Sequence, residues 1–190
     1  VSMYMFHGGT NFWYMNGANT AGGYRPQPTS YDYDAPLGEW GNCYPKYYAF
    51  REVIQKHLPH GTVLPEVPAD NPTTTFATIE LKESAPLQAA FHQTTESENV
   101  LSMEDLGVDF GYIHYQTTIN KAGKQKLIIQ DLRDYAVILV DGKQVASLDR
   151  RYNQNNVMLD IQKAPATLEI LVENTGRVNY GPDILFNRKG

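Results

Sequence analysis

Apolar and polar positions follow two different periods along this chain, and the change between them divides it in two. Over residues 1–58, an apolar run leads into a long polar and aromatic connection, and a helical period follows. From Phe76 onward, apolar residues recur at every second position in short runs. A period near 3.6 is typical of an amphipathic helix, and a period of two is typical of a half-buried strand. The pattern therefore predicts a β/α unit followed by an all-β domain.

The chain begins with an apolar run that passes into paired glycines. Residues 1–7 are predicted to form a buried strand, and Gly8 and Gly9 follow directly. Residues 8–43 are rich in Gly, Asn and Pro and also carry many aromatic side chains. A connection of this length inside a compact domain is usually functional. In an α/β barrel, side chains that follow a strand face the ligand, so this segment resembles one wall of a binding site.

A helix is predicted over residues 46–57, where apolar side chains recur at spacings near 3.6. Pro45 suits the first turn of that helix, and Pro59 stops it. Residues 59–75 are rich in proline and form the predicted linker. We therefore predict three regions: the last β/α unit of an α/β barrel at 1–58, the linker at 59–75 and a β-sandwich domain at 76–190.

Six to eight short strands are predicted in the last region. The segments with alternating apolar side chains are 76–81, 87–91, 112–119, 126–130, 135–140, 144–148, 156–161 and 166–172. The pair Asp141-Gly142 separates two of them and is a strong signal for a type I′ hairpin. Many short strands with turns between them are typical of a β-sandwich of jelly-roll type.

Composition and charge exclude several classes of function. The formal net charge is −5 and the basic residues are scattered, which argues against a nucleic-acid partner. No apolar run approaches the roughly 18 residues that a membrane span needs. Cys43 is the single cysteine and the five histidines form no cluster with ligand spacing, so we expect no metal site and no cofactor. The chain begins inside a predicted strand, and we therefore expect it to be part of a longer protein.

Aromatic and amide side chains in the connection suit a sugar, but the carboxylates there do not form a convincing catalytic pair. Glycoside hydrolysis needs two carboxylates at a fixed separation. Asp32 and Asp34 alternate along a stretch that we expect to be extended, so their side chains should point in opposite directions. Asp34 precedes Ala35-Pro36 and is suited to capping a turn, and a structural role is favoured for both aspartates. By the same alternation, at most one of Tyr31 and Tyr33 should face a given ligand.

Two further polar positions each have two interpretations. Asn11 either binds a ligand or fastens the loop, and the second is favoured. Arg177, with Tyr180 close by, lies where a predicted strand enters a turn punctuated by glycine. It either reaches another domain or pairs locally with Glu173 or Asp183 inside a packed loop, and the local interpretation is slightly favoured.

Four runs of this sequence stand out as motifs: MYMFHGGTNF at 3–12, NGAN at 16–19, PTSYDYDAPL at 28–37, and LVEN with GRVNYG at 171–181. Together they resemble glycoside hydrolase family 35, the lysosomal-type β-galactosidases. The resemblance implies a TIM barrel followed by β-sandwich domains of galactose-binding-like topology. It also implies retaining hydrolysis of terminal β-galactosides by two glutamates at the ends of barrel strands 4 and 7. Residues 1–7 would correspond to strand 8, so both glutamates are expected upstream of Val1 and no catalytic residue is expected in this chain.

The resemblance implies two substrate-binding residues. Tyr33 matches the tyrosine that contacts galactose, and Tyr180 matches an aromatic residue that leans toward the sugar pocket. The sequence departs from the family pattern at Trp13 and Trp40, which either provide a stacking platform or fill space. The implied partners are a β-galactoside and the remainder of the barrel. The implied location is lysosomal, extracellular or periplasmic.

A different class of function also fits the alternating region. Residues 73–190 would form a non-catalytic carbohydrate-binding or scaffolding module if the sandwich carried an exposed aromatic platform. The candidate side chains are Tyr112, Tyr115, Tyr135 and Tyr152, although each is more simply a strand-packing residue. A third interpretation is a relative whose longer protein has lost one of the two glutamates.

Overall fold

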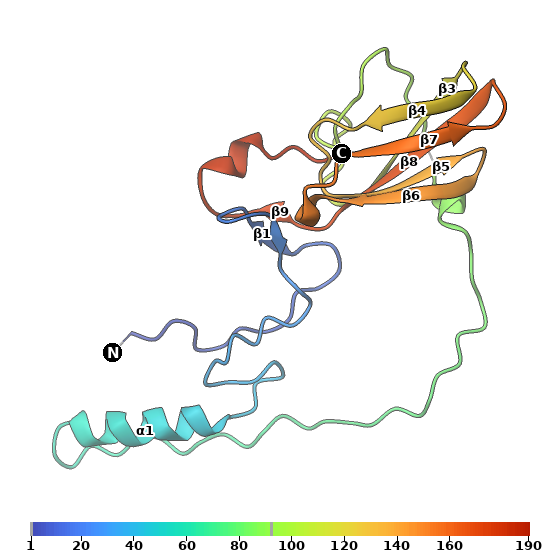
Figure 1. The fold of residues 1–190 in the computed structure, drawn as a ribbon. Helices are drawn as coiled ribbons and strands as arrows, with labels where there is room; N and C mark the ends of the chain where they lie inside the picture. The colour runs from blue at the N-terminus through green and yellow to red at the C-terminus, as the bar shows by residue number, and fades with distance from the viewer. Residues whose placement is uncertain (1, 92) are drawn as a thin grey trace. The chain divides into compact units, whose positions relative to one another are not determined.

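The computed structural model describes residues 2–91 and 93–190 (Figure 1). These residues divide into two compact units. The first unit comprises the residues up to Thr10 together with Ser30–Asn99, and the second comprises Asn11–Thr29 together with Val100–Gly190. The segment 11–29 thus folds with the β-rich C-terminal part, although its neighbours on both sides belong to the first unit. None of the helices among the described residues has the length and apolar character required to cross a membrane.

The predicted helix is present in the first unit as α1 (Pro45–His57). Pro45 occupies the first turn, where its missing amide proton leaves no unsatisfied hydrogen bond inside the helix. The helix ends at Leu58, whose backbone is extended because Pro59 follows it. Lys56 and His57 lie in the last turn, where positive charge is favourable. The prediction of a helix over 46–57 is confirmed.

The strand predicted over residues 1–7 is wrong for the described residues 2–7. Only His7 is bridged, in parallel with Leu37, and the Leu37 amide donates to the Phe6 carbonyl at 3.2 Å. Tyr4 is 86% exposed, so the run is not buried either. A strand forms only where neighbouring strands complete its hydrogen bonds, and an apolar run does not supply those neighbours. Val1 lies outside the described residues.

The connection after α1 contains no strand among its described residues. The segment 76–81, expected to be a strand, has no regular structure and is exposed throughout. The other expected strand, near 87–91, is instead the 3₁₀ helix η1 (Leu87–Ala90). Figure 1 shows a long strand-free path between α1 and η1. Alternation did not produce strands here because alternation alone does not supply the neighbouring strand that completes the backbone hydrogen bonds.

The second unit contains two antiparallel sheets that share one core. The larger sheet has the order β3-β8-β5-β6 and the smaller one pairs β4 with β7 (Figure 1). The strands are β3 (Gly111–Ile119), β4 (Gly123–Ile128), β5 (Tyr135–Val140), β6 (Lys143–Asp149), β7 (Asn156–Ile161) and β8 (Ala166–Asn174). Every strand pair in both sheets is antiparallel. The predicted all-β region is confirmed from β3 onward.

The β5–β6 hairpin has the turn that its sequence predicts. Asp141 and Gly142 have φ values of 49° and 74°, and positive φ at both central residues is the requirement of a type I′ turn. Asp141 Oδ1 also accepts a hydrogen bond of 2.8 Å from the Thr167 amide at the start of β8. The turn therefore joins three neighbouring strands and fixes their register.

Side chains that alternate along the strands fill the core between the two sheets. Ile138 on β5 and Val172 on β8 are essentially buried and come from the larger sheet. Leu159 and Ile161 on β7 come from the smaller sheet and belong to the same buried cluster. Because one core draws side chains from both sheets, the two sheets pack face to face.

A third, small sheet joins the segment 11–29 to the end of the chain. Its strands are β1 (Gly17–Asn19), β2 (Arg25–Pro26) and β9 (Arg177–Val178), in the order β2-β1-β9. β1 runs antiparallel to β2 and parallel to β9. Ala18, Tyr24 and Val178 form a buried cluster of their own. The sequence pattern did not predict these strands because each is too short to show a period.

Candidate functional site

Tyr31 and Tyr33 lie together on one turn of the first unit. Their ring centroids are 5.5 Å apart. The expectation that they face opposite ways was wrong because the stretch is not extended: Tyr33 and Asp34 have φ values of 60° and 50° and turn the chain. Left-handed backbone at two residues other than glycine is rare and is often retained at functional sites.

Tyr33 is exposed and has a second aromatic neighbour. The Tyr4 ring meets it edge-on with centroids 6.4 Å apart, and Tyr33 is 60% exposed. We call Tyr4, Tyr31 and Tyr33 the tyrosine group. Each ring combines an apolar face with a hydroxyl that donates or accepts a hydrogen bond. This combination matches the C–H faces and hydroxyls of a sugar ring.

Asp32 and Asp34 fasten the turn that carries these rings. Asp32 Oδ1 accepts a hydrogen bond of 3.0 Å from the Asp34 amide, and Oδ2 accepts one of 2.9 Å from the Tyr44 hydroxyl. That hydrogen bond raises the pKa of Tyr44 above its usual value. Lys46 Nζ, at the start of α1, lies 2.5 Å from Asp34 Oδ2. The favoured structural role of the two aspartates is confirmed.

We call the turn at residues 31–34 the tyrosine turn. Gly8 allows the backbone to approach this turn closely. A Cβ atom at Gly8 would lie 1.7 Å from the Tyr31 carbonyl oxygen, which is far inside van der Waals contact. The next residue, Gly9, accepts a hydrogen bond of 2.9 Å from the Tyr31 amide. The paired glycines therefore hold the chain before the turn against the turn itself.

Potential metal-ligand side chains are dispersed in the part of the chain that is described. Among residues 2–91 and 93–190, no three His, Cys, Asp or Glu side chains lie close enough to hold an ion. Cys43 is a free thiol and is partly buried.

The second predicted site residue, Tyr180, lies in the second unit. It occupies the turn between β9 and η3 (Pro182–Phe186) and is 76% exposed. The backbone just before it is fixed, because the Asn179 amide donates to the Ala18 carbonyl at 3.1 Å. Tyr33 and Tyr180 thus each lie on an ordered turn with an exposed ring, in separate units.

Arg177 pairs inside the second unit, but not with the residues that the favoured interpretation expected. Its guanidinium forms an ion pair with Glu104 at 2.5 Å, and its Nε donates to the Asp109 carbonyl at 2.7 Å. The expected partners, Glu173 and Asp183, are not the residues that it contacts in these bonds. Burial works to raise the pKa of Glu104, but hydrogen bonds from Arg177 and from a backbone amide outweigh it, so the net shift is downward.

Asn11 closes the segment 11–29, and the aromatic residues after it attach the segment to the rest of the second unit. Asn11 Nδ2 donates to the Pro28 carbonyl at 2.8 Å, which confirms that this amide fastens the loop. Trp13 packs against Phe110 with ring centroids 4.9 Å apart, yet remains 74% exposed. Tyr14 meets Tyr112 edge-on at 5.8 Å.

The tyrosines proposed as a binding platform on the sandwich do not form one. Tyr112, Tyr115 and Tyr135 are partly buried, and only Tyr152 of the four is exposed. Burial contributes most to raising the pKa of Tyr112 and of Tyr115 to about 12 in each case. The Tyr115 hydroxyl donates to the Leu101 carbonyl at 2.8 Å, as expected for a packing residue.

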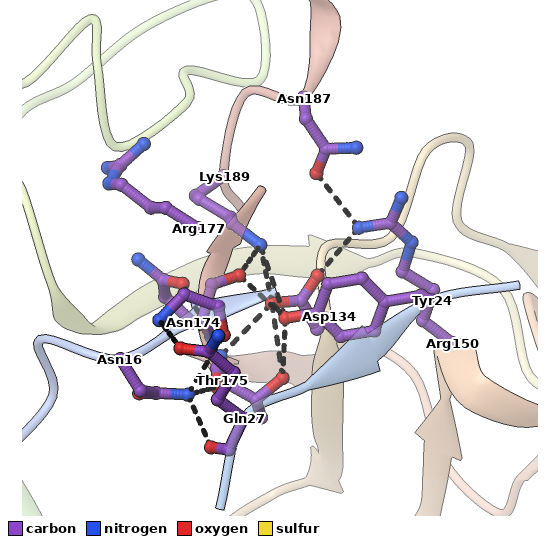
Figure 2. A network of polar contacts seen from close by, with 12 residues as sticks. Asn16, Tyr24, Gln27, Asp134, Arg150, Asn174, Thr175, Arg177, Asn187 and Lys189 are labelled. Atoms are coloured by element: carbon purple, nitrogen blue, oxygen red, sulfur yellow. Dashed lines mark hydrogen bonds and ion pairs between the residues drawn. The ribbon is translucent and has the colours of Figure 1, made fainter. Parts of the chain in front are cut away.

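The most extensive polar network of the second unit surrounds Asp134. Figure 2 shows its carboxylate between the Lys189 ammonium, the Tyr24 hydroxyl and the Arg150 guanidinium. Lys189 Nζ lies 2.7 Å from Oδ2, the Tyr24 hydroxyl lies 2.8 Å from the same oxygen, and Arg150 Nη1 lies 2.8 Å from Oδ1. The Thr175 amide donates to Oδ2 at 3.0 Å. We call Tyr24, Asp134 and Lys189 the buried triad.

Burial is the main influence on the pKa values of Lys189 and Tyr24 in the buried triad. Lys189 is fully buried and Asp134 is 2% exposed. Burial lowers the pKa of Lys189 to about 8, although the neighbouring Asp134 carboxylate opposes that shift. Burial and the same carboxylate raise the pKa of Tyr24 above its usual range. Arg150 also stacks over the Tyr24 ring, with its guanidinium carbon 4.3 Å from the centroid.

Sequence reasoning missed the buried triad, and no local signal could have revealed it. Lys189 follows Arg188 in a polar stretch and has the pattern of a solvated charge. Asp134 stands just before β5, in a position where turns often place an aspartate. The three side chains meet because the starts of β2 and β5 and the end of the chain come together, which a local pattern does not encode.

Comparisons with protein families match the two ends of the chain separately. Residues 1–57 match the profile described as glycosyl hydrolases family 35. Residues 100–190 match the profile described as beta-galactosidase, first all-beta domain. The two matches follow the order expected from the sequence resemblance.

Proteins described as beta-galactosidases are similar to this chain over nearly its whole length. A beta-galactosidase of Xanthomonas manihotis is 41% identical over 194 residues, covering 100% of this chain and 32% of that protein. A beta-galactosidase of Mus musculus is 43% identical over 196 residues, covering 95% of this chain and 29% of that protein. The chain thus spans less than a third of the length of these curated relatives.

Among solved structures, a GH2 beta-galacturonidase from Eisenbergiella tayi bound to galacturonate aligns with 48% of this chain and 18% of that chain. Its sequence identity is 27% and the TM-score is 0.35. A TM-score of that size does not establish a shared fold.

Proposed function

The chain belongs to glycosyl hydrolases family 35, and on that premise we propose that it is part of a retaining β-galactosidase. The whole protein would remove terminal non-reducing β-D-galactose residues from glycans and oligosaccharides. The observation that carries this proposal is the pair of consecutive family matches, at 1–57 and 100–190. Relatives named beta-galactosidase that extend over nearly the whole chain support it.

We further propose that residues 1–58 are the last β/α unit of a TIM barrel, 59–75 a linker and 76–190 a sandwich of jelly-roll, galactose-binding-like topology. The support in the first unit is an apolar groove along α1. It is lined by Met3, Phe50, Val53, Ile54, His57 and Leu58. No side chain of α1 is buried by the described residues. An apolar helix face of this kind is what the neighbouring elements of a barrel would cover, so the remainder of the barrel is the proposed partner.

The catalytic carboxylates are proposed to lie before Val1. Asp32 and Asp34 are engaged in fastening a turn, and neither pairs with another carboxylate across an open site. A retaining mechanism needs one glutamate to protonate the leaving oxygen and a second to attack the anomeric carbon. The contribution of this chain would then be to bind and orient the sugar.

Tyr33 and Tyr180 are the proposed sugar-binding residues. Both rings are largely exposed while the backbone beneath each is held by hydrogen bonds. A phenol held on a fixed turn can stack on the apolar face of galactose and donate to one hydroxyl without losing much side-chain freedom. Such contacts orient the anomeric carbon toward the proposed nucleophile.

The test uses the whole protein and a chromogenic β-galactoside. We expect turnover by the whole protein and none by the isolated 190 residues. Tyr33→Phe should lower kcat/KM by roughly three- to tenfold, because a net neutral hydrogen bond contributes about 0.5–1.5 kcal/mol. Tyr48→Phe, on the exposed side of α1, is the matched control and should leave kcat/KM unchanged. Turnover by the isolated chain, or none by the whole protein, would refute the proposal.

A further inference from the structure

Residues 11–29 form a loop that is closed at its base, and we call them the site loop. Thr10 and Ser30, which flank it in the first unit, form an antiparallel bridge. One residue further in, the Asn11 amide donates to the Thr29 carbonyl at 2.7 Å. The chain therefore leaves the first unit and returns to it at neighbouring points. Everything beyond this base folds with the second unit.

The site loop is built into the β-domain as an additional strand. β1 pairs in parallel with β9, with Gly17 opposite Arg177 and Ala18 opposite Val178. Asn16 Nδ2 donates to the Thr175 carbonyl at 2.7 Å, just before β9 begins. Parallel pairing between two strands of two or three residues is weak alone, so the position of the loop must depend on other contacts.

The buried triad supplies part of those contacts, in addition to the packing of Trp13 and Tyr14 on the β-domain. The Tyr24 hydroxyl and Lys189 Nζ both lie within hydrogen-bond distance of Asp134 Oδ2, at 2.8 and 2.7 Å. Both also reach the Gly176 carbonyl, each at 2.7 Å. A buried ammonium without its carboxylate is strongly unfavourable, so Lys189 and Asp134 stay paired and present one fixed carboxylate oxygen to the Tyr24 hydroxyl. Tyr24, at the far end of the site loop, is held in that arrangement.

The other end of the site loop leads directly into the tyrosine group. Tyr31 is the second residue after Thr29, and its amide donates to the Gly9 carbonyl at 2.9 Å. Tyr33 follows on the left-handed turn. A change in the path of the loop at its base would therefore act on the backbone that orients Tyr33.

We propose that Tyr24, Asp134 and Lys189 are positioning residues for the sugar site: they fix the site loop on the β-domain and thereby hold the tyrosine turn. The β-domain then shapes the site through the covalent path of the loop, in addition to any contact of its own with the sugar. This inference rests on the proposed role of Tyr33 in binding a β-galactoside.

The first experiment separates positioning from general stability by steady-state kinetics on the whole protein. Tyr24→Phe removes one hydroxyl and keeps the ring beneath Arg150. We expect KM for a β-galactoside to rise about fivefold while kcat changes less than twofold, because the loss falls on sugar binding. Lys189→Met should raise KM further, and Lys143→Met, at an exposed lysine on β6, should leave KM unchanged.

The KM and kcat values distinguish a positioning role of the triad from a role in stability alone. A role in stability alone would reduce the amount of folded enzyme, which lowers the apparent kcat and leaves KM as it was. An unchanged KM in Tyr24→Phe, measured well below the unfolding temperature, would therefore overturn the inference. If the wild-type protein hydrolyses no β-galactoside, the proposed function fails, and hydrogen exchange alone decides the inference.

Amide hydrogen exchange measures the coupling between the buried triad and the tyrosine turn without any substrate. In Tyr24→Phe, exchange should accelerate at Gly17–Asn19 and also at the amides of Asn11 and Tyr31, which close the base of the loop and brace the turn. Exchange in β8 should stay as in the wild type. Acceleration confined to β1, with the Asn11 and Tyr31 amides unchanged, would show that the triad does not reach the turn and would overturn the inference.

Discussion

The Tyr24 hydroxyl lies 2.8 Å from Oδ2 of Asp134, although 110 positions separate the two residues in the sequence. The contact joins a loop that follows the N-terminal family motif to the first residue before β5. Lys189 Nζ lies 2.7 Å from the same Asp134 oxygen and belongs to the same network. Two regions that match different family profiles are therefore joined in one buried network.

Replacement of Lys189 by methionine should destabilise the second unit. Methionine fills most of the volume but leaves the buried Asp134 carboxylate with Arg150 as its remaining positive neighbour. Removing one partner of a buried ion pair costs about 3–5 kcal/mol, and we expect a value near the lower end because Arg150 stays. The measurement is the free energy of opening at β8 amides, obtained from native-state hydrogen exchange.

Lys143→Met controls for the loss of a lysine as such. Lys143 is exposed at the start of β6, and we expect its replacement to change the same free energy by less than about 0.5 kcal/mol. Equal effects of the two substitutions would mean that the triad does not stabilise the unit.

Acid should weaken the second unit between about pH 4 and about pH 2. A backbone hydrogen bond from Ser102 and the Arg188 guanidinium lower the pKa of Asp105 to about 2, and Arg151 lowers the pKa of Asp149. The folded-state pKa values lie below the unfolded ones, so the stabilisation is present above the unfolded values and is lost as pH falls through the folded values. Thermal unfolding followed by circular dichroism at a series of pH values measures this slope.

Asp105→Asn tests the assignment of that slope. The variant has no carboxylate to protonate at this position, so its unfolding temperature should fall less steeply below pH 4 than that of the wild type. Asp160→Asn, at an exposed position on β7, should retain the wild-type slope. If the two variants behave alike, Asp105 is not a source of the acid sensitivity.

Elements whose stability is encoded locally could be predicted from the sequence. The limits of β5 and β7 were predicted to the residue, because each buries alternate side chains between two turns. The helix over 46–57 was predicted because Pro45 and Pro59 mark its ends. In these cases the local pattern and the tertiary packing favour the same structure.

Features that depend on distant partners could not be predicted. The apolar run at 2–7 has strand character, yet a strand requires neighbours that the described residues do not provide. The turn at Tyr33 was missed because alternation assumes extended backbone, whereas Tyr33 and Asp34 adopt positive φ. The family resemblance implied a site role for Tyr33, which stays a prediction, and neither the motif nor the pattern indicated that Tyr31 would lie against it.

Gly8→Ala should impair the proposed sugar site more than the fold. An added Cβ would meet the Tyr31 carbonyl, a backbone atom that moves only if the tyrosine turn moves with it. We expect kcat/KM for a β-galactoside to fall at least tenfold, because a displacement near 1 Å at a binding group can cost as much as a hundredfold. Gly123→Ala is the control: its Cβ would meet no atom within 4 Å and its positive φ strains only the start of β4, so the loss of kcat/KM should be several times smaller. Similar losses in both variants would indicate that Gly8 has no special role beside the turn.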